Sequence, residues 1–490
     1  MESSILQLKD GRYFIDENQS RIYATLLEKR PHYSSEYHWN EMSMADLFAD
    51  CYKHNTLYCP EMKSWYTYDG SIWVVDTGSV IATDRLKEFV KLLNIYACEL
   101  SSDEVDVAKY QKFVSSLSDR RARDRILKDA QSEACVYLDQ FDKNPYLINC
   151  ENGTYDLEHD TFHLHTPTDY LTLKTKCVYV VPTARSNYKC DRFFQFLDEI
   201  TKNDKQKLDY LHRALGYSLV GVLPEECMFF AWGKTTRNGK GTLYESIVNL
   251  LGDYGGVADS KLICSSNANQ SANAANPALC ALRGKRLVIM SETDERDTID
   301  SKIVKSYTGN DTISTRNLYG SQFTMRLQCT FWLMCNHLPK VNDHTIFDSD
   351  RAKVITFDRH FDENTRDTTL KKQFATDEAK AVIFMWLIEG YKKYLKEKLT
   401  EPECVKQAIK KYEVKDDFVK AFISECCTEN ETDEVSKQTI YESFENWRIK
   451  GDYPIIHKQN FYRKIDDLYE SYTKGGYRYY KGIGLKQPKN

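Results

Sequence analysis

The sequence predicts an α/β protein of several domains, built around a core that contains a glycine-rich phosphate-binding loop. Its 490 residues exceed what one hydrophobic core usually covers, because a single core rarely grows past roughly 250 to 300 residues. The stretch from about 201 to 400 alternates helical patterns with short apolar strands, which is typical of a sheet covered by helices. One of these strands runs directly into a glycine-rich loop and then a helical pattern, the order that a phosphate-binding loop requires.

The composition excludes several classes of protein. The net charge of −5 is too small to mark the whole chain as a polyanion binder, so nucleic-acid contacts would come from local patches. Residues 437–490 carry 11 Lys and Arg against 6 Asp and Glu, a net +5 that leaves −10 for the rest. The 15 cysteines include no CxxC pair, which indicates neither a zinc site nor a disulfide framework. No membrane-spanning run or signal peptide is recognisable, so we expect a cytoplasmic protein without membrane contact.

Changes in periodicity divide the chain into four expected regions. Residues 1–100 form an α+β module of unknown role, with a hairpin around Asp69-Gly70. Residues 101–200 change from helices to short strands, and residues 401–490 form a helical linker and a winged-helix unit. Residues 201–400 hold the α/β core, whose expected strands are Cys227–Trp232, Leu287–Met290, Phe331–Met334 and Val354–Phe357.

The glycine-rich loop follows the first core strand. Its small residues would let successive N–H groups converge on phosphates, and Lys240 would reach the β- and γ-phosphates of ATP. The Ser or Thr that usually follows the lysine is Gly241 here, so Thr242 is the candidate Mg²⁺ ligand. A glycine turn with a chance lysine is the alternative interpretation. The candidate nucleotide-binding residues are Gly233, Thr236, Asn238, Gly239, Lys240, Gly241 and Thr242.

Polar residues also follow the next two core strands. Glu292 and Asp294 come after one of them, where Glu292 would polarise the attacking water or hold Mg²⁺ and Asp294 would share that work. Asn336 follows another strand, and its amide would orient water between the γ-phosphate and the acid. The alternatives are solvated strand-end acids and a turn asparagine.

Arg351 precedes the last core strand. It is the candidate arginine finger, which would reach the ATP of a neighbouring subunit. The alternative is a surface ion pair with Asp348 or Asp350.

With these elements in place, the chain between about Asn144 and Leu485 resembles the superfamily 3 helicases that end phage and plasmid primase-helicases and the poxvirus primase-helicase. The motifs that carry the resemblance are 144–149, 152–157, 236–242, 291–293, Lys305 with 308–311, and 335–339. The resemblance implies an AAA+ type ATPase core that uses ATP and Mg²⁺. It also implies a homo-hexameric ring that moves 3′ to 5′ on single-stranded DNA.

Carried over residue by residue, the resemblance places Lys240 and Thr242 in Walker A and Glu292 in Walker B. Asn336 falls at sensor 1 and Arg351 at the finger, although the family often has paired arginines where this chain has Asp350-Arg351. The primase domain usual in the family is not recognisable upstream, because the N-terminal region is short and shows no metal-binding pattern of acids. A separate primase is therefore one expected partner.

Two sets of residues are candidates for DNA contact, with solvated helix faces as the alternative. Lys302, Lys305, Arg316 and Tyr319 match the family's segment leading to the pore hairpin. A separate cluster, Arg120, Arg121, Arg123 and Arg125, is expected to form a helical face at a subunit boundary, again with a solvated face as the alternative. In the winged-helix unit, a second helix and a Gly-Gly hairpin would contact origin duplex DNA or a protein. Their candidate residues are Lys458, Asn460, Arg463, Lys464, Lys474 and Arg478.

We therefore expect a helicase that initiates replication for a phage, plasmid or phage satellite in the bacterial cytosol. A second hypothesis is a helicase that depends on a separate primase and a separate origin binder. The two differ in whether the isolated tail prefers particular duplex sequences. A third is a nucleotide-gated scaffold, for which Lys240→Ala would leave biological activity intact.

Overall fold

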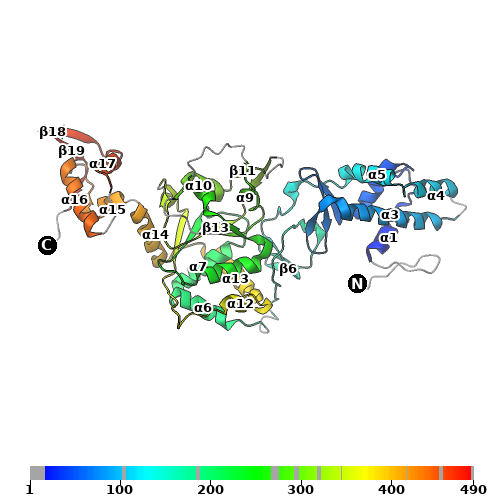
Figure 1. Ribbon diagram of the computed structural model, residues 1–490, viewed down its shortest axis with the longest axis horizontal. Coiled ribbons are helices and arrows are strands. Elements are labelled where there is room, and N and C mark those ends of the chain that lie inside the picture. Colours follow the sequence, from blue (N-terminus) through cyan, green and yellow to red (C-terminus); the bar gives the residue numbers. More distant parts are fainter. Residues whose placement is uncertain are drawn as a thin grey trace.

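The computed structural model describes residues 17–101, 106–181, 183, 188–265, 275–291, 297–316, 322–343, 345–416, 418–451 and 456–486. The molecule is elongated, with an N-terminal module at one end, a central α/β body and a small C-terminal unit at the other end (Figure 1). Among the described residues, no helix is both long enough and apolar enough to span a bilayer.

The N-terminal module packs five helices and a three-stranded antiparallel sheet. Its helices are α1 (Glu17–Lys29), α2 (Glu41–Tyr52), α3 (Val80–Cys98), α4 (Val107–Ser116) and α5 (Arg120–Glu133), and its strands are β1 (Thr56–Cys59), β2 (Ser64–Tyr68) and β3 (Trp73–Asp76). The expected hairpin is present. Asp69 Oδ1 accepts the N–H groups of Ser71 and Ile72 at 2.7 and 2.8 Å, and Gly70 takes the positive φ of +105° that its turn requires. One apolar cluster runs from Ile22 to Ala134, so packing continues across residue 100.

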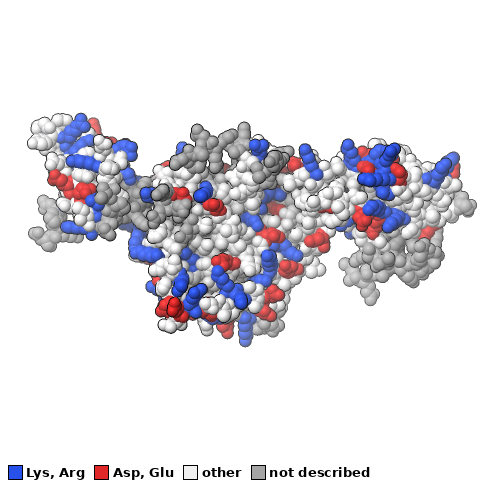
Figure 2. Space-filling view, viewed as in Figure 1, with Lys and Arg blue, Asp and Glu red and all other residues white. Residues whose placement is uncertain are grey.

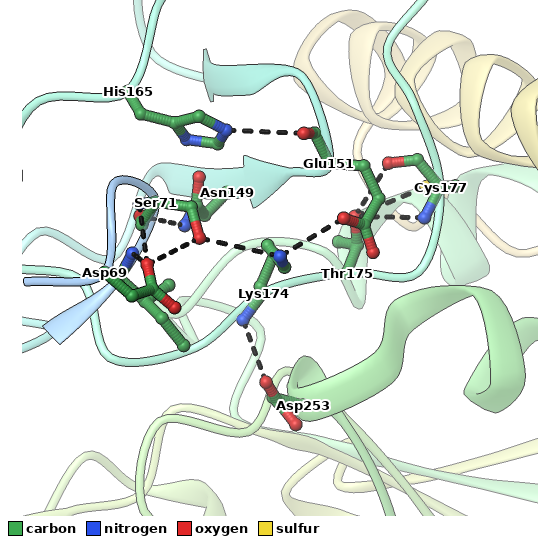
Figure 3. Close-up of polar contacts among 10 residues, drawn as sticks. Asp69, Ser71, Asn149, Glu151, His165, Lys174, Thr175, Cys177 and Asp253 are labelled. Carbon is green, nitrogen blue, oxygen red and sulfur yellow. Dashed lines mark hydrogen bonds and ion pairs between the residues drawn. The ribbon is translucent and has the colours of Figure 1, made fainter. Parts of the chain in front are cut away.

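A short antiparallel sheet joins this module to the central body, and its polar contacts are drawn in Figure 3. The sheet comprises β4 (Leu147–Cys150), β5 (Gly153–Asp156) and β6 (Thr161–His163). The fully buried Asn149 donates from its side-chain amide to Ser71 O at 2.9 Å, and its main-chain oxygen accepts Thr175 N–H at 2.8 Å. Lys174 pairs with Glu151 at 3.2 Å and donates its N–H to Asp253 at 3.1 Å. The hairpin turn of the N-terminal module is thereby connected to the central body.

The central body is built on a parallel sheet in the order β15-β7-β13-β9-β8. Its strands are β7 (Met228–Trp232), β8 (Gly255–Ala258), β9 (Leu287–Met290), β13 (Thr330–Cys335) and β15 (Ala352–Thr356). Four of them lie at the expected positions. β8 was not predicted, because its sequence Gly-Gly-Val-Ala lacks the branched or aromatic residues typical of strands.

Alternating side chains bury both faces of the sheet. Phe229 and Ala231 belong to a core shared with α6 (Asp191–Thr201), α7 (Lys205–Tyr217), α8 (Lys240–Leu251) and α13 (Asp377–Glu397). Phe230 and Trp232 belong to the core on the opposite face. That core also takes residues from α9 (Pro277–Cys280), α10 (Ser301–Thr308), α11 (Thr345–Asp348) and α14 (Glu403–Asp416).

Helices α7 and α13 cross at a pair of glycines. A Cβ added to Gly390 would lie 2.3 Å from His212 O, and one added to Gly216 would lie 2.1 Å from Tyr391 N. The His212 ring stacks on Trp386 with 4.2 Å between ring centroids, and its Nε2 lies 2.6 Å from Trp386 O. Burial lowers the pKa of His212 to about 4.

Smaller elements flank the main sheet. They are α12 (Leu370–Gln373), the parallel pair β10 (Thr298–Ile299) and β14 (Lys340–Val341), and the antiparallel pair β11 (Thr312–Thr315) and β12 (Phe323–Arg326). The β11–β12 pair lies in chain order between β9 and β13, at the place where the pore hairpin was expected.

The C-terminal unit has its own apolar core, formed around Phe422, Phe444, Phe461 and Tyr480. Its helices are α15 (Phe418–Cys426), α16 (Lys437–Lys450) and α17 (Lys458–Asp466), and its sheet has the order β17-β19-β18. The strands are β17 (Glu434–Ser436), β18 (Ser471–Lys474) and β19 (Tyr477–Lys481), with a small pair of β16 (Cys427–Thr428) and β20 (Gly484–Leu485) beside them. Gly475 and Gly476 form the hairpin turn with φ of +59° and +84°.

Candidate nucleotide site

The candidate site lies where the parallel strands β7, β13 and β15 end together. Trp232, the last residue of β7, is in register with Cys335 of β13 and Thr356 of β15. The glycine-rich loop therefore leaves the sheet beside Asn336, and Gly233 N–H donates to Cys335 O at 3.1 Å. In open α/β sheets, ligands bind outside the carboxyl ends of the strands.

The loop brings Lys240 to the end of β13. Its ammonium Nζ lies 2.9 Å from Asn336 Oδ1, 3.1 Å from Cys335 O and 3.5 Å from Gly233 O. Lys240 is only 6% exposed, and a buried ammonium is costly unless oxygens surround it. Two residues predicted for the site, Lys240 and Asn336, are thus in direct contact although 96 positions separate them.

Close contacts explain why glycines occupy two positions of the loop. A Cβ on Gly233 would lie 2.2 Å from Asn238 Nδ2 and 2.7 Å from Phe357 O. Gly239 takes a φ of +87°, which favours glycine. The buried Asn238 braces the loop itself, because its amide donates to Thr235 O at 2.6 Å and its oxygen accepts Lys240 N–H at 3.4 Å. Thr236 is exposed, and its carbonyl lies 2.9 Å from His360 Nδ1.

Helix α8 begins at Lys240, so its first N–H groups point out of the helix end. The first N–H groups of a helix have no partner within it, and the helix end carries partial positive charge that favours anions. A cavity of about 410 Å³ opens beside Gly239, Gly241 and Thr242. These features fit the phosphates of a nucleotide.

Four basic side chains line the same cavity, and none was a predicted site residue: Arg192, Arg237, Arg366 and Lys371. Arg192 of α6 is paired with Glu199 at 3.2 Å and lies 3.6 Å from Asp367. Lys371 of α12 forms an ion pair with Glu245 of α8. Arg237 stands within the motif and was identifiable from it, whereas the others come from elements distant along the chain.

Of the three residues predicted to bind Mg²⁺, only Thr242 lies among the described residues, and it lines the cavity. Glu292 and Asp294 lie outside the described residues, immediately after Ser291 at the end of β9. Within the described part of the chain, no group of three His, Cys, Asp or Glu side chains could hold a metal. The hydroxyl of Thr242 is an oxygen donor of the kind that suits Mg²⁺.

Arg351 lies at the opposite end of the strands from the loop, immediately before β15 begins. Its guanidinium forms an ion pair with Glu226, and Nη1 donates to Thr308 Oγ1 at 2.7 Å and to Glu226 O at 3.2 Å. Asp350, an alternative partner expected from the sequence, lies 3.9 Å from Lys353 instead. Arg351 is therefore held within its own chain by a residue 125 positions away.

The basic residues of the central body differ in their surroundings. Lys302 is exposed on α10 and Arg316 is exposed after β11. Lys305 is half-buried and donates to Thr345 Oγ1 at 2.6 Å, while Tyr319 lies outside the described residues. In the N-terminal module, Arg125 pairs with Glu41 of α2. Arg120, Arg121 and Arg123 lie in the first turn of α5, and Arg123 Nη1 donates to Ser118 O at 2.6 Å.

The predicted DNA contacts of the C-terminal unit are mostly at its surface. Asn460, Arg463 and Arg478 are exposed, and Lys464 is half-buried. Lys458 lies over the ring of Tyr441, 5.0 Å from its centroid. Lys474 donates to Glu434 at 2.7 Å.

Comparison with known proteins adds two family matches and several relatives. Residues 45–202 match the family described as "D5 N terminal like", and residues 231–351 match a "Family of unknown function (DUF5906)". The "Putative helicase L207/L206" of Acanthamoeba polyphaga mimivirus is 25% identical over 479 residues, covering 88% of this chain and 49% of that protein. The "Putative helicase 121R" of Invertebrate iridescent virus 3 is 25% identical over 405 residues, covering 74% of this chain and 42% of that protein.

Among solved structures, an apo form of the NrS-1 C terminal region covers 88% of this chain and 96% of that chain, at 10% identity and a TM-score of 0.44. A likeness this distant supports no conclusion about function. The chain spans about half the length of the curated relatives it matches. The chain is therefore similar to viral proteins named putative helicases, and its residues 45–202 are similar to the D5 N terminal like family.

Proposed function

We propose that the chain is an ATP-dependent DNA helicase of the superfamily 3, AAA+ kind, acting in viral or plasmid replication. The observation that carries the proposal is the contact of Lys240 with Asn336 at the joined carboxyl ends of β7 and β13. In a P-loop enzyme the lysine contacts the terminal phosphates, so Asn336 would stand beside the phosphoryl group that is transferred. The helicase names of the viral relatives support the same proposal.

Each residue would have a distinct role in ATP hydrolysis. Lys240 and the N–H groups at the start of α8 would bind the phosphates and stabilise their charge. Asn336 would orient the attacking water, and Glu292 would polarise that water with Asp294 beside it. Bound Mg²⁺ would neutralise phosphate charge, with the hydroxyl of Thr242 as one ligand.

Arg351 is proposed as the finger that acts on the neighbouring subunit's ATP in a homo-hexameric ring. It lies at the amino ends of the strands, away from the nucleotide site of its own subunit at their carboxyl ends. To act in trans it would exchange the carboxylate of Glu226 for the γ-phosphate. Mixed rings of Arg351→Ala and Lys240→Ala subunits should therefore hydrolyse ATP that neither variant hydrolyses alone, because a site with an intact Lys240 can then lie beside a neighbour with an intact Arg351.

Two surfaces are proposed to hold DNA. The β11–β12 hairpin, with Lys302, Lys305 and Arg316 near it, would bind single-stranded DNA inside the ring. The ring would move along that strand in the 3′-to-5′ direction. The C-terminal unit would act as a winged helix in which α17 enters the major groove of origin duplex. A separate primase remains a proposed partner.

A strand-displacement assay tests the proposal most broadly. Purified protein, ATP and Mg²⁺ should separate a forked duplex and a duplex with a 3′ tail, but not one with only a 5′ tail. Electron microscopy of the same sample should show six-membered rings. Unwinding only from a 5′ tail would contradict the polarity, and absence of rings under unwinding conditions would contradict the assembly.

A further inference from the structure

The outer face of the C-terminal sheet carries exposed aromatic residues that the proposed function does not use. In the β18–β19 hairpin, Tyr472 is opposite Tyr479, and Lys474 is opposite Tyr477. Residues directly opposite in an antiparallel pair share a face of the sheet. Three tyrosines and a lysine therefore project from one side of this hairpin.

That side points away from the core of the unit. Tyr480, the neighbour of Tyr479, is fully buried and donates its hydroxyl to Asp466 of α17 at 2.9 Å. Because successive side chains alternate between faces, Tyr479 and Lys481 point outward. Tyr477 is 67% exposed, and Tyr472 and Tyr479 are half-buried.

Contacts hold two of the three tyrosine rings, those of Tyr472 and Tyr479, in place. The Tyr472 hydroxyl donates to Glu434 of β17, which also accepts Lys474 at 2.7 Å. The rings of Tyr472 and Tyr479 lie with centroids 6.0 Å apart and planes 31° from parallel. Fixed aromatic rings lose little conformational freedom when a flat ligand stacks on them.

We infer that this face, made of Tyr472, Tyr477 and Tyr479 with Lys474 and Lys481, binds an unpaired strand of nucleic acid by stacking its bases on the tyrosines. Aromatic side chains interleaved with cations are the arrangement that binds single strands without sequence preference. Over the C-terminal unit as a whole, residues 418–490, Lys and Arg exceed Asp and Glu by only 12 to 11, so the cations that favour the strand's phosphates are Lys474 and Lys481 of this face. The hairpin stands at one end of the molecule, where a strand can reach it (Figure 1).

The visible face of the C-terminal unit carries Lys and Arg side chains together with Asp and Glu, beside uncharged surface toward its outer end (Figure 2). Such a unit would hold duplex on α17 and unpaired strand on the sheet, as at a junction where DNA opens. Binding here needs no ATP hydrolysis, so the inference goes beyond the proposed motor.

The test compares full-length variants in the absence of nucleotide. Fluorescence anisotropy would measure binding to an oligothymidylate and to an abasic strand of the same length. Changing both Tyr477 and Tyr479 to Ala should weaken oligothymidylate binding about ten-fold or more, the scale of base stacking, and leave abasic binding unchanged. The matched control is Tyr33→Ala, which removes a 73% exposed tyrosine from the N-terminal module.

Two further measurements separate this surface from the motor and from misfolding. Tyr→Phe changes at the same two positions keep the rings and should keep wild-type affinity. With 5-iodouracil in the strand, ultraviolet light should cross-link it to the β18–β19 peptide, equally in wild type and in Lys240→Ala. Equal loss of oligothymidylate and abasic binding, loss of duplex binding alone, or cross-links only to the central body would each overturn the inference.

Discussion

The central body and the C-terminal unit present their candidate residues in opposite ways. Lys240 and Asn238 are buried, with Lys240 bonded to the main-chain oxygen of Cys335 in β13 and Asn238 to that of Thr235 in the loop. Arg463 and Asn460 are exposed on a small unit with a separate core. Chemistry on phosphates requires fixed groups shielded from water, whereas binding a polynucleotide requires reachable ones. The two regions should therefore respond differently to mutation.

The largest effect is expected at Lys240. Lys240→Ala should lower ATP turnover by about 100-fold or more, because it removes a fixed positive charge from the phosphates. Circular dichroism melting should show that the fold is retained. If this variant hydrolysed ATP within a few-fold of wild type, the buried site would not be the site of hydrolysis.

A steric change in the core should destabilise the protein without touching the candidate site. Gly390→Ala places a methyl group 2.3 Å from His212 O, where α7 and α13 cross, and should cost about 1 to 3 kcal/mol of unfolding free energy. Chemical denaturation would measure the loss. Gly241→Ala is the control, since its added Cβ meets no atom closer than 3.4 Å. Equal stability of the two variants would contradict the close crossing.

The same crossing should make stability depend on pH. The pKa of His212 falls from 6.5 to about 4 on burial, so below pH 6.5 the unfolded chain binds a proton that the folded chain does not. His212 therefore contributes no pH dependence above pH 6.5. Between pH 6.5 and 4 it removes about 3 kcal/mol of stability. Denaturation of wild type and His212→Gln across this range should show a larger loss in wild type than in the variant, and parallel curves would refute it.

The smallest effect is expected at an exposed residue of the C-terminal unit. Arg463→Ala should weaken binding to all duplex sequences several-fold and reduce the salt dependence of binding by about one ion, if Arg463 contacts phosphate. Titrations at several salt concentrations would measure both. Folding and ATP turnover should be unchanged. A loss confined to particular sequences would instead place Arg463 on a base.

Sequence patterns located the buried residues of the candidate site better than the side chains that surround them. Strand periodicity and the glycine loop located four strands of the sheet, and the two strand ends brought Lys240 to Asn336. The cavity residues Arg192, Arg366 and Lys371 carried no such signal, because they converge only after α12 packs against α8 and α6 packs against the loop at Gly239. The partner of Arg351 was missed for the same reason, since Glu226 lies on a different element.

The exposed residues had the weakest signature. The Gly-Gly turn between β18 and β19 indicated a hairpin, but only the register showed which of its tyrosines share the outer face. Residues that act at a surface need neither burial nor fixed spacing, so the chain order alone does not distinguish them from ordinary solvated side chains.

The central claim is that the site at Lys240 converts ATP hydrolysis into strand separation. The direct measurement follows both on one preparation, with ATP, Mg²⁺ and a forked duplex, for wild type and for Lys240→Ala. The account predicts that wild type hydrolyses ATP and separates the strands, and that the variant loses both activities together. Strand separation that persists in Lys240→Ala, or wild-type hydrolysis that never separates strands, would contradict it.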